Sequence, residues 1–100
     1  MIDDEPPPGF AWDRAKAAQN LVKHGVSFAE AATIFDDPTV HVRIDELHSW
    51  GEARLTGTGR SAAGRLLVVS YTMRGEVTRI ISAWRATPYA ARQYRDDSGS

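Results

Sequence analysis

Residues 66–85, LLVVSYTMRGEVTRIISAWR, decide the fold, because they predict two adjacent antiparallel strands joined by a tight turn at residues 73–76. The unbroken apolar run at residues 66–69 is typical of a strand buried on both faces. In the second strand, strict alternation places Arg79 and Arg85 on the same face. A central strand rarely carries charge without a partner or a function, so this strand is the first place to look for a site.

The composition favours a single globular domain. One hundred residues, of which 42% are hydrophobic and 25% charged, are enough for one modest core. The absence of cysteine excludes a disulfide framework and thiolate chemistry. No apolar run is long enough for a bilayer, and residues 1–9 lack the basic and apolar regions of a signal peptide. We therefore expect a cytoplasmic protein that does not bind a membrane.

The charge distribution separates the termini from the body. Five acidic residues lie in residues 1–9 and 96–100, whereas all twelve lysines and arginines lie within residues 10–95. The body is therefore mildly cationic, which permits an anionic partner such as a nucleic acid but does not require one. We expect residues 1–9 to be a flexible leader, residues 10–95 a single domain and residues 96–100 a flexible tail.

Two helices are predicted near the N-terminus. Asp13 is a suitable N-cap for a helix that ends at Gly25. Ser27 and Glu30 have the spacing of a capping box for a second helix, which must end before Pro38. The periodicity of the first helix assigns two faces. The residues expected on the inner face are Ala15, Ala18, Leu21 and Val22, and those expected on the outer face are Lys16, Asn20 and Lys23.

Two further strands and a final helix complete the predicted elements. Residues 39–45 alternate as in a half-buried edge strand. The residues expected to point inward are Val40, Val42 and Ile44, and those expected to point outward are His41, Arg43 and Asp45. Residues 53–60 predict another strand, in which Gly57 and Gly59 favour a bulge or close helix packing. Residues 87–95 predict a short helix with threonine at the N-cap and proline at N1.

This order of elements predicts an α+β fold with two N-terminal helices, a four-stranded antiparallel sheet and a short C-terminal helix. Consecutive strands with short links form antiparallel meanders. We expect the helices to cover one face of the sheet and to leave the other face open. Arginines from several strands are expected on that open face, where a polyanion could bind.

Several stretches resemble the BrnT toxins of bacterial type II toxin–antitoxin systems. They are FAWDRAKAAQNLVKHGVSFAEAATIFDDP, GEARLTGTGRS, GRLLVVSYT and RIISAWRAT. The resemblance covers residue 10 to about residue 94, which is nearly the whole domain. The most specific pieces are the W-D start, KHGVSF at residues 23–28, FDDP at residues 35–38 and the segment R-I-I-S-A-x-R-A-T, which ends at Thr87.

The resemblance implies a RelE-like fold and a small ribonuclease that inhibits translation by cutting RNA. It also implies neutralisation by a BrnA-type antitoxin in a dimer or heterotetramer, with operator DNA bound only through the antitoxin. The chain departs from the family pattern at Trp84, where the family usually carries a basic residue. This departure leaves an alternative open, namely an inactive RNA-binding or antitoxin-binding module that acts as corepressor of its operon.

Metal-independent RNA cleavage requires a base for the 2′-hydroxyl, an acid for the leaving 5′-oxygen and cations around the phosphate. Arginine suits the last role because its planar fork binds two phosphate oxygens. We assign this role to Arg60, Arg79 and Arg85, and the alternative for each is a surface residue paired with a carboxylate. Arg79 is the best candidate because its neighbours along the strand are apolar.

Five other residues complete the expected site. Glu52 is either a general base, an orienting partner of an arginine, or a simple salt-bridge residue. His24 suits proton transfer, although a cation in the last turn of a helix also stabilises the helix dipole. Lys23, Arg54 and Trp50 form the expected RNA-binding set, and Trp50 would stack on a base or contact a protein partner.

No metal or cofactor is expected. The three histidines lack ligand spacing, and the sequence contains no HExxH motif and no glycine-rich phosphate loop before a helix. A metal-dependent nuclease remains a third interpretation, and it requires that a chelator stops the activity.

Overall fold

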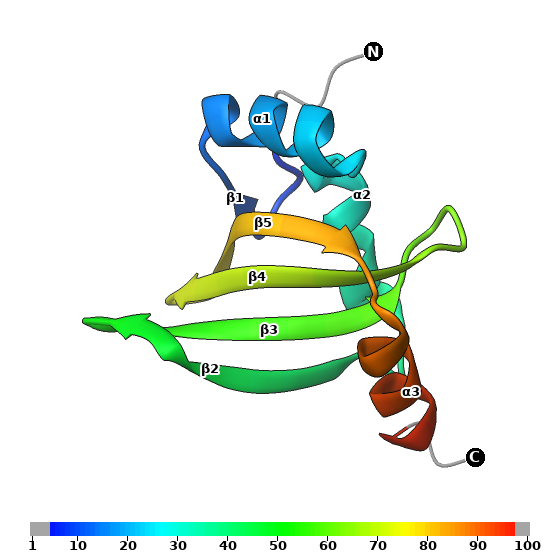
Figure 1. Ribbon diagram of the computed structural model, residues 1–100. Coiled ribbons are helices and arrows are strands. Elements are labelled where there is room, and N and C mark those ends of the chain that lie inside the picture. The colour runs from blue at the N-terminus through cyan, green and yellow to red at the C-terminus, as the bar shows by residue number, and fades with distance from the viewer. Residues whose placement is uncertain (1–4, 98–100) are drawn as a thin grey trace.

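The computed structural model describes residues 5–97, whose strands form one five-stranded sheet flanked by helices (Figure 1). In chain order the elements are β1 (Phe10–Ala11), α1 (Arg14–His24), α2 (Phe28–Ala32), the 3-10 helix η1 (Thr33–Asp36), β2 (His41–Trp50), β3 (Glu52–Arg60), β4 (Leu66–Arg74), β5 (Val77–Arg85) and α3 (Pro88–Asp97). The strand order across the sheet is β1-β5-β4-β3-β2.

The prediction of a four-stranded antiparallel sheet behind two N-terminal helices is wrong. The sheet is mixed, because β1 pairs in parallel with β5, with Phe10 opposite Thr78 and Ala11 opposite Arg79. The amide of Thr78 donates to the carbonyl oxygen of Gly9 over 2.8 Å. A two-residue strand is too short to show a period of two, so the sequence indicated only an extended segment there. The second predicted helix is divided into α2 and η1.

A β-bulge in β5 separates Arg79 from Arg85. The β4–β5 register shifts so that Ile81 has no direct partner on β4. Directly paired residues project to the same face of a sheet. Arg79 is paired with Thr72 and Arg85 with Leu67, and these two β4 residues lie on opposite faces. The prediction that both arginines share one face is therefore wrong, because one extra residue reverses the alternation.

The core fills one face of the sheet, beneath α1, α2 and η1. Its largest fully buried side chains are Phe28, Ile34, Leu67, Ile80, Val26 and Val69. Two glycines of β3 allow η1 to approach the sheet, as the sequence predicted for close helix packing. A Cβ at Gly57 would lie 3.4 Å or more from its neighbours, whereas a Cβ at Gly59 would lie 3.1 Å from Cβ of Ile34 and 3.2 Å from its carbonyl oxygen.

These two glycines provide a matched test of the packing. We expect Gly59→Ala to lower the free energy of unfolding by about 1–3 kcal/mol, because the added methyl group meets backbone that cannot move aside. Gly57→Ala should be neutral or stabilising by roughly 0.4–1 kcal/mol, because its methyl group fits and the unfolded chain loses entropy. Urea denaturation of both variants measures the difference. Equal effects would show that η1 does not rest on Gly59.

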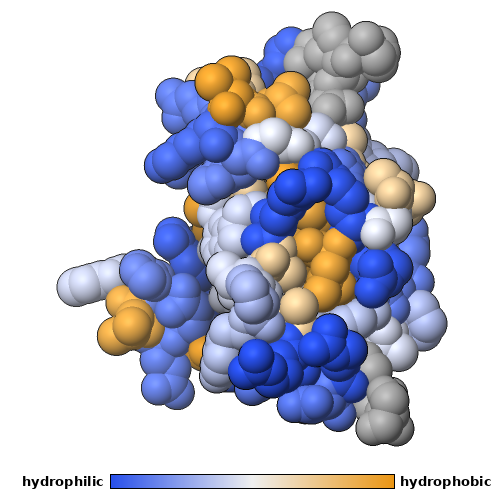
Figure 2. Space-filling view, turned by 45° about the vertical axis from the view of Figure 1, so that its right-hand side comes forward, coloured by the Kyte–Doolittle hydropathy of each residue, from blue (hydrophilic) through white to orange (hydrophobic). Residues whose placement is uncertain are grey.

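The inner face of α1 differs from the predicted one. Leu21 is 49% exposed and Val22 is 89% exposed, so the predicted apolar face points largely to solvent. Figure 2 shows apolar side chains gathered at the top of the molecule, over α1. Asn20, which was predicted to face outward, is 6% exposed and lies against the sheet beside Ala17. The face of α1 that packs against the sheet is therefore narrow, and the polar side chain of Asn20 lies at its centre.

The amide of Asn20 takes the place of a neighbouring strand. Its Nδ2 donates to the carbonyl oxygens of Ala83 and Val26 over 2.9 Å, and its Oδ1 accepts from the amide of Ala83 over 3.1 Å. On the β1 side of β5, strand pairing stops at Arg79. The backbone of Ala83 on that side therefore has no neighbouring strand among residues 5–97. Buried backbone groups need hydrogen bonds, and Asn20 supplies them.

The edge strand β2 also departs from the predicted pattern. Val42 and Ile44 are exposed, because α1, α2 and η1 do not extend over β2 on their side of the sheet and no described strand lies beyond it (Figure 1). His41 and Arg43 instead line a cavity of about 210 Å³ together with Tyr89 of α3. The final helix therefore covers part of the face that was predicted to be open. The remaining part of that face lies toward the β2–β3 hairpin.

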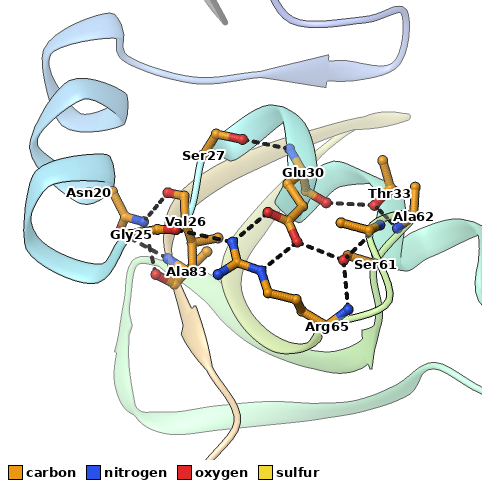
Figure 3. A network of polar contacts seen from close by, with 11 residues as sticks. Asn20, Gly25, Val26, Ser27, Glu30, Thr33, Ser61, Ala62, Arg65 and Ala83 are labelled. Atoms are coloured by element: carbon orange, nitrogen blue, oxygen red, sulfur yellow. Dashed lines mark hydrogen bonds and ion pairs between the residues drawn. The ribbon is translucent and has the colours of Figure 1, made fainter.

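A half-buried ion pair between Arg65 and Glu30 ties α2 and the loop after α1 to the β3–β4 connection (Figure 3). Arg65 donates from Nε and Nη2 to the carboxylate of Glu30, and from Nη2 to the carbonyl oxygen of Gly25 over 3.1 Å. Ser61 donates its hydroxyl to the same carboxylate over 2.7 Å. The hydrogen bond from Arg65 lowers the pKa of Glu30, while desolvation opposes this shift. The network fixes the segment that follows His24.

Asp37 connects η1, β3 and α3. It accepts hydrogen bonds from the hydroxyl of Tyr94 over 2.6 Å, from the amide of Arg60 over 2.8 Å and from the amide and hydroxyl of Thr39. Burial alone would raise the pKa of Asp37, but these hydrogen bonds outweigh it and hold the pKa well below the usual range. The C-terminal helix therefore depends on an ionised carboxylate.

The lowered pKa values of Asp37 and Glu30 predict acid lability. Both groups stabilise the fold above their ordinary pKa values, and this contribution is lost as the pH falls and the native carboxylates take up protons. We expect the free energy of unfolding to decline below about pH 4. Asp37→Asn should lower it by about 1–3 kcal/mol at neutral pH and make its acid dependence shallower. Urea titrations at several pH values measure this, and an unchanged slope in the variant would contradict it.

Candidate nucleic-acid interface

A polar hollow of about 310 Å³ opens on the uncovered part of the sheet. We call it the arginine hollow. It is lined by Lys16, His48, Trp50, Glu52, Arg54, Thr72, Arg74, Arg79 and Ile81. These residues come from α1, the β2–β3 hairpin and the adjoining ends of β4 and β5. Four basic side chains face one carboxylate, so the hollow attracts anions.

Three adjacent strands place Arg54, Thr72 and Arg79 in one row across the hollow. Arg54 of β3 is paired directly with Thr72 of β4, and Thr72 is paired with Arg79 of β5. The register of the hairpin turn gives Arg79 this position, because Arg74 is paired with Val77 and Met73 with Thr78. Because neighbouring strands lie about 4.8 Å apart, the two arginines project from backbone positions about 10 Å apart, with the threonine between them.

The Arg54–Thr72–Arg79 row has hydrogen-bonding capacity that the described residues do not use. Thr72 is 4% exposed, yet its Oγ1 has no hydrogen-bond partner within residues 5–97. Nε of Arg54 is also buried without a partner in that range. Over the same residues, Arg79 forms no ion pair. A buried unpaired polar group costs about 1–3 kcal/mol, so these donors indicate a ligand with acceptor oxygens.

The rim of the hollow holds an exposed ion pair and a contact between a histidine and a carboxylate. Arg74 donates to Glu52 over 3.2 Å, and Nδ1 of His48 lies 2.9 Å from Oδ2 of Asp45. An exposed ion pair such as Arg74–Glu52 contributes about 0–1 kcal/mol, so it orients side chains more than it stabilises the fold. Trp50 stands beside them at the end of the hairpin.

His24 and Lys23 lie in the adjacent cavity. This second hollow of about 240 Å³, here the histidine hollow, runs along α1 and shares Lys16 and Ile81 with the arginine hollow. The ring of His24 is 6.3 Å from that of Trp84, centre to centre. The two cavities together form a continuous polar surface from the hairpin to the end of α1.

Arg60 and Arg85 lie outside both hollows. Arg60 is at the opposite end of β3 from Arg54, about 20 Å along the strand, and its Nη1 donates to the carbonyl oxygen of Gly64. Arg85 projects toward the helix-covered face, where its charge helps to lower the pKa of Glu30. Of the three arginines predicted to act together, only Arg79 lines the arginine hollow.

The sequence indicated some members of this surface and missed others. Glu52, Arg54 and Trp50 line the arginine hollow beside Arg79, although the register that brings them there was not predicted from the sequence. Lys16, Thr72 and Arg74 were missed as site residues. A correct register for β3, β4 and β5 would have placed Thr72 between the two arginines, but register depends on contacts distant in sequence.

Trp84, the departure from the family pattern, does not contact the arginine hollow. It lines the cavity beneath α3 and is paired with Val68 on β4. Residues 5–97 contain no group of three or more histidine, aspartate or glutamate side chains suited to a metal ion. No helix within these residues has the length and apolar character of a membrane span.

Comparison with known proteins gives one family. The model of the BrnT family, described as the ribonuclease toxin of type II toxin–antitoxin systems, matches residues 12–89. The fold is similar to the crystal structure of the Brucella abortus ribonuclease toxin BrnT, with 22% sequence identity and a TM-score of 0.60 over 78% of this chain and 95% of that chain. At this identity the similarity shows a shared fold. Comparison with curated protein sequences finds no match.

Proposed function

Because the chain belongs to the BrnT family of ribonuclease toxins of type II toxin–antitoxin systems, we propose that it cleaves RNA at the arginine hollow without a metal ion. The unsatisfied Arg54–Thr72–Arg79 row is the observation that carries this proposal. The buried donors of this row have no acceptor, and Arg79 has no ion-pair partner, among the described residues. A phosphodiester supplies both acceptor oxygens and negative charge. Cutting RNA in the cytoplasm would inhibit translation.

The proposed reaction is a transesterification. The 2′-oxygen attacks the adjacent phosphorus as its proton passes to a base, and the bond from phosphorus to the 5′-oxygen breaks as that oxygen receives a proton. The products are a 2′,3′-cyclic phosphate and a 5′-hydroxyl. Arg79 and Arg54 would stabilise the charge that develops on the pentacoordinate phosphate.

We assign the proton transfers to one residue of each hollow. Glu52 is the one carboxylate among the residues that line the arginine hollow, and its ion pair with Arg74 fixes its position, so we assign it the base. His24 lies in the adjoining histidine hollow with Lys23 and is assigned the acid. Arg60 and Arg85 receive no role in the reaction, because neither lines these cavities.

The family also supports an antitoxin partner. We propose a BrnA-type antitoxin that covers the arginine hollow, in a dimer or heterotetramer, and that carries the operator-binding surface. The polar, partly unneutralised hollow is suited to acidic side chains of such a partner.

Incubating the purified chain with labelled total RNA tests the proposed function. We expect cleavage that persists in EDTA and leaves 5′-hydroxyl ends that polynucleotide kinase can label directly. Loss of cleavage in EDTA would contradict the metal-independent reaction. Intact RNA together with tight antitoxin binding would instead support a corepressor that has lost catalysis.

A further inference from the structure

Trp50 is held beside the arginine hollow by the turn of the β2–β3 hairpin. It is paired directly with Glu52 around Gly51, whose φ of 80° is readily available only to glycine. The indole is 85% exposed, although it lines the hollow on one side. Figure 2 shows a pale group of atoms projecting from the body at the left, with apolar atoms below it and closer to the body.

Hydrogen-bond donors and an exposed aromatic ring therefore lie side by side in the arginine hollow. The Arg54–Thr72–Arg79 row offers donors for phosphate oxygens, and the exposed indole offers a flat apolar surface beside them. A nucleotide combines a phosphate with a flat aromatic base. Stacking of a base on an aromatic side chain is tolerant of sequence, because every base has a π face.

We propose that the arginine hollow selects unpaired RNA by binding one nucleotide at two points, with its phosphate on the Arg54–Thr72–Arg79 row and its base stacked on Trp50. This inference rests on the proposed function and adds the class of RNA. In a duplex the faces of the bases are covered by their neighbours, so only a single-stranded segment can present a base to the indole.

The surroundings of Trp50 favour RNA over a protein ligand at this point. Leu47, on the same hairpin, is 84% exposed but does not line the hollow. A protein interface centred on the hairpin would use both side chains, whereas a nucleotide in the hollow would use Trp50 alone. Leu47 is thus a matched control on the same hairpin.

The test measures binding without cleavage. The probe is a short single-stranded RNA with 2′-O-methyl groups, which block attack by the 2′-oxygen, and fluorescence anisotropy gives its Kd with the full chain. We expect Trp50→Ala to weaken binding by about 5- to 100-fold, Trp50→Phe to weaken it less, and Leu47→Ala to leave it unchanged. The same probe annealed to its complement should bind more weakly to the wild type and should not respond to Trp50→Ala.

An abasic probe separates stacking from a general loss of affinity. Removing the stacked base should weaken binding to the wild type but not further weaken binding to Trp50→Ala, and scanning the abasic position along the probe locates that base. Equal Kd values for wild type and Trp50→Ala on the single strand would overturn the inference. Equal loss in Trp50→Ala and Leu47→Ala would overturn it in favour of a protein interface on the hairpin. Absence of total-RNA cleavage with these binding results intact would refute the proposed reaction only.

Discussion

Replacing Arg79 with alanine is expected to lower the rate of RNA cleavage by about 10²–10³-fold. Arg79 lies on the uncovered face of β5, ends the Arg54–Thr72–Arg79 row and has no ion-pair partner within residues 5–97. Its charge is therefore available to stabilise the phosphate in the transition state. Single-turnover cleavage of a labelled RNA measures the loss, and the unfolding midpoint of the variant verifies that it is folded.

Three comparisons sharpen this test. Arg92→Ala, on an exposed position of α3, is the matched control and should cleave at the wild-type rate. Arg79→Lys should recover only part of the rate, because an ammonium group does not bind two phosphate oxygens in one plane. Arg60→Ala and Arg85→Ala should lose much less activity than Arg79→Ala, since neither arginine lines the hollow. A larger loss in either of these would contradict the site.

Replacing Asn20 with alanine is expected to lower the free energy of unfolding by about 3–5 kcal/mol, the largest effect on stability predicted for this chain. The change removes three hydrogen bonds and leaves two backbone groups of Ala83 and the carbonyl of Val26 without partners. Chemical denaturation measures the loss. Gln19→Ala, at the adjacent exposed position of α1, should change stability by no more than about 0.5 kcal/mol.

Asn20→Asp distinguishes the hydrogen bonds from simple packing. The aspartate has nearly the same size as asparagine, but it presents a carboxylate to the two carbonyl oxygens that receive the Nδ2 protons. We expect it to be at least as destabilising as alanine. If it were as stable as the wild type, Asn20 would act by filling space alone.

The local chemistry of the chain was predictable where neighbouring residues determine the conformation. The side chain of Asp13 caps α1 and Gly25 ends it with a φ of 70°, and the hydroxyl of Ser27 accepts from the amide of Glu30 as a cap should. The predicted hairpin is confirmed as β4 and β5 with a turn at Gly75. Each of these features depends on residues within a few positions of one another.

The features that the sequence did not predict all depend on distant partners. The bulge at Ile81 is visible only in the register of β5 against β4, and β1 exists as a strand only because β5 lies beside it. Asn20 was assigned to solvent because amphipathic periodicity treats asparagine as an outer residue, whereas its partner Ala83 lies 63 residues away. For the same reason, the sequence selected Arg79, Arg54 and Trp50 separately but could not show that they meet.

The bulge is a position at which β5 can lose one residue without a change in the faces of its other side chains. Ile81 is the one residue between Arg79 and Arg85 without a direct partner on β4, so deleting it would leave Arg79 paired with Thr72 and Arg85 with Leu67, and each arginine would keep its face. A related chain that lacks this residue would therefore present the same arginines on each face of its sheet. Alignments of related chains should therefore allow a one-residue gap at the position of Ile81.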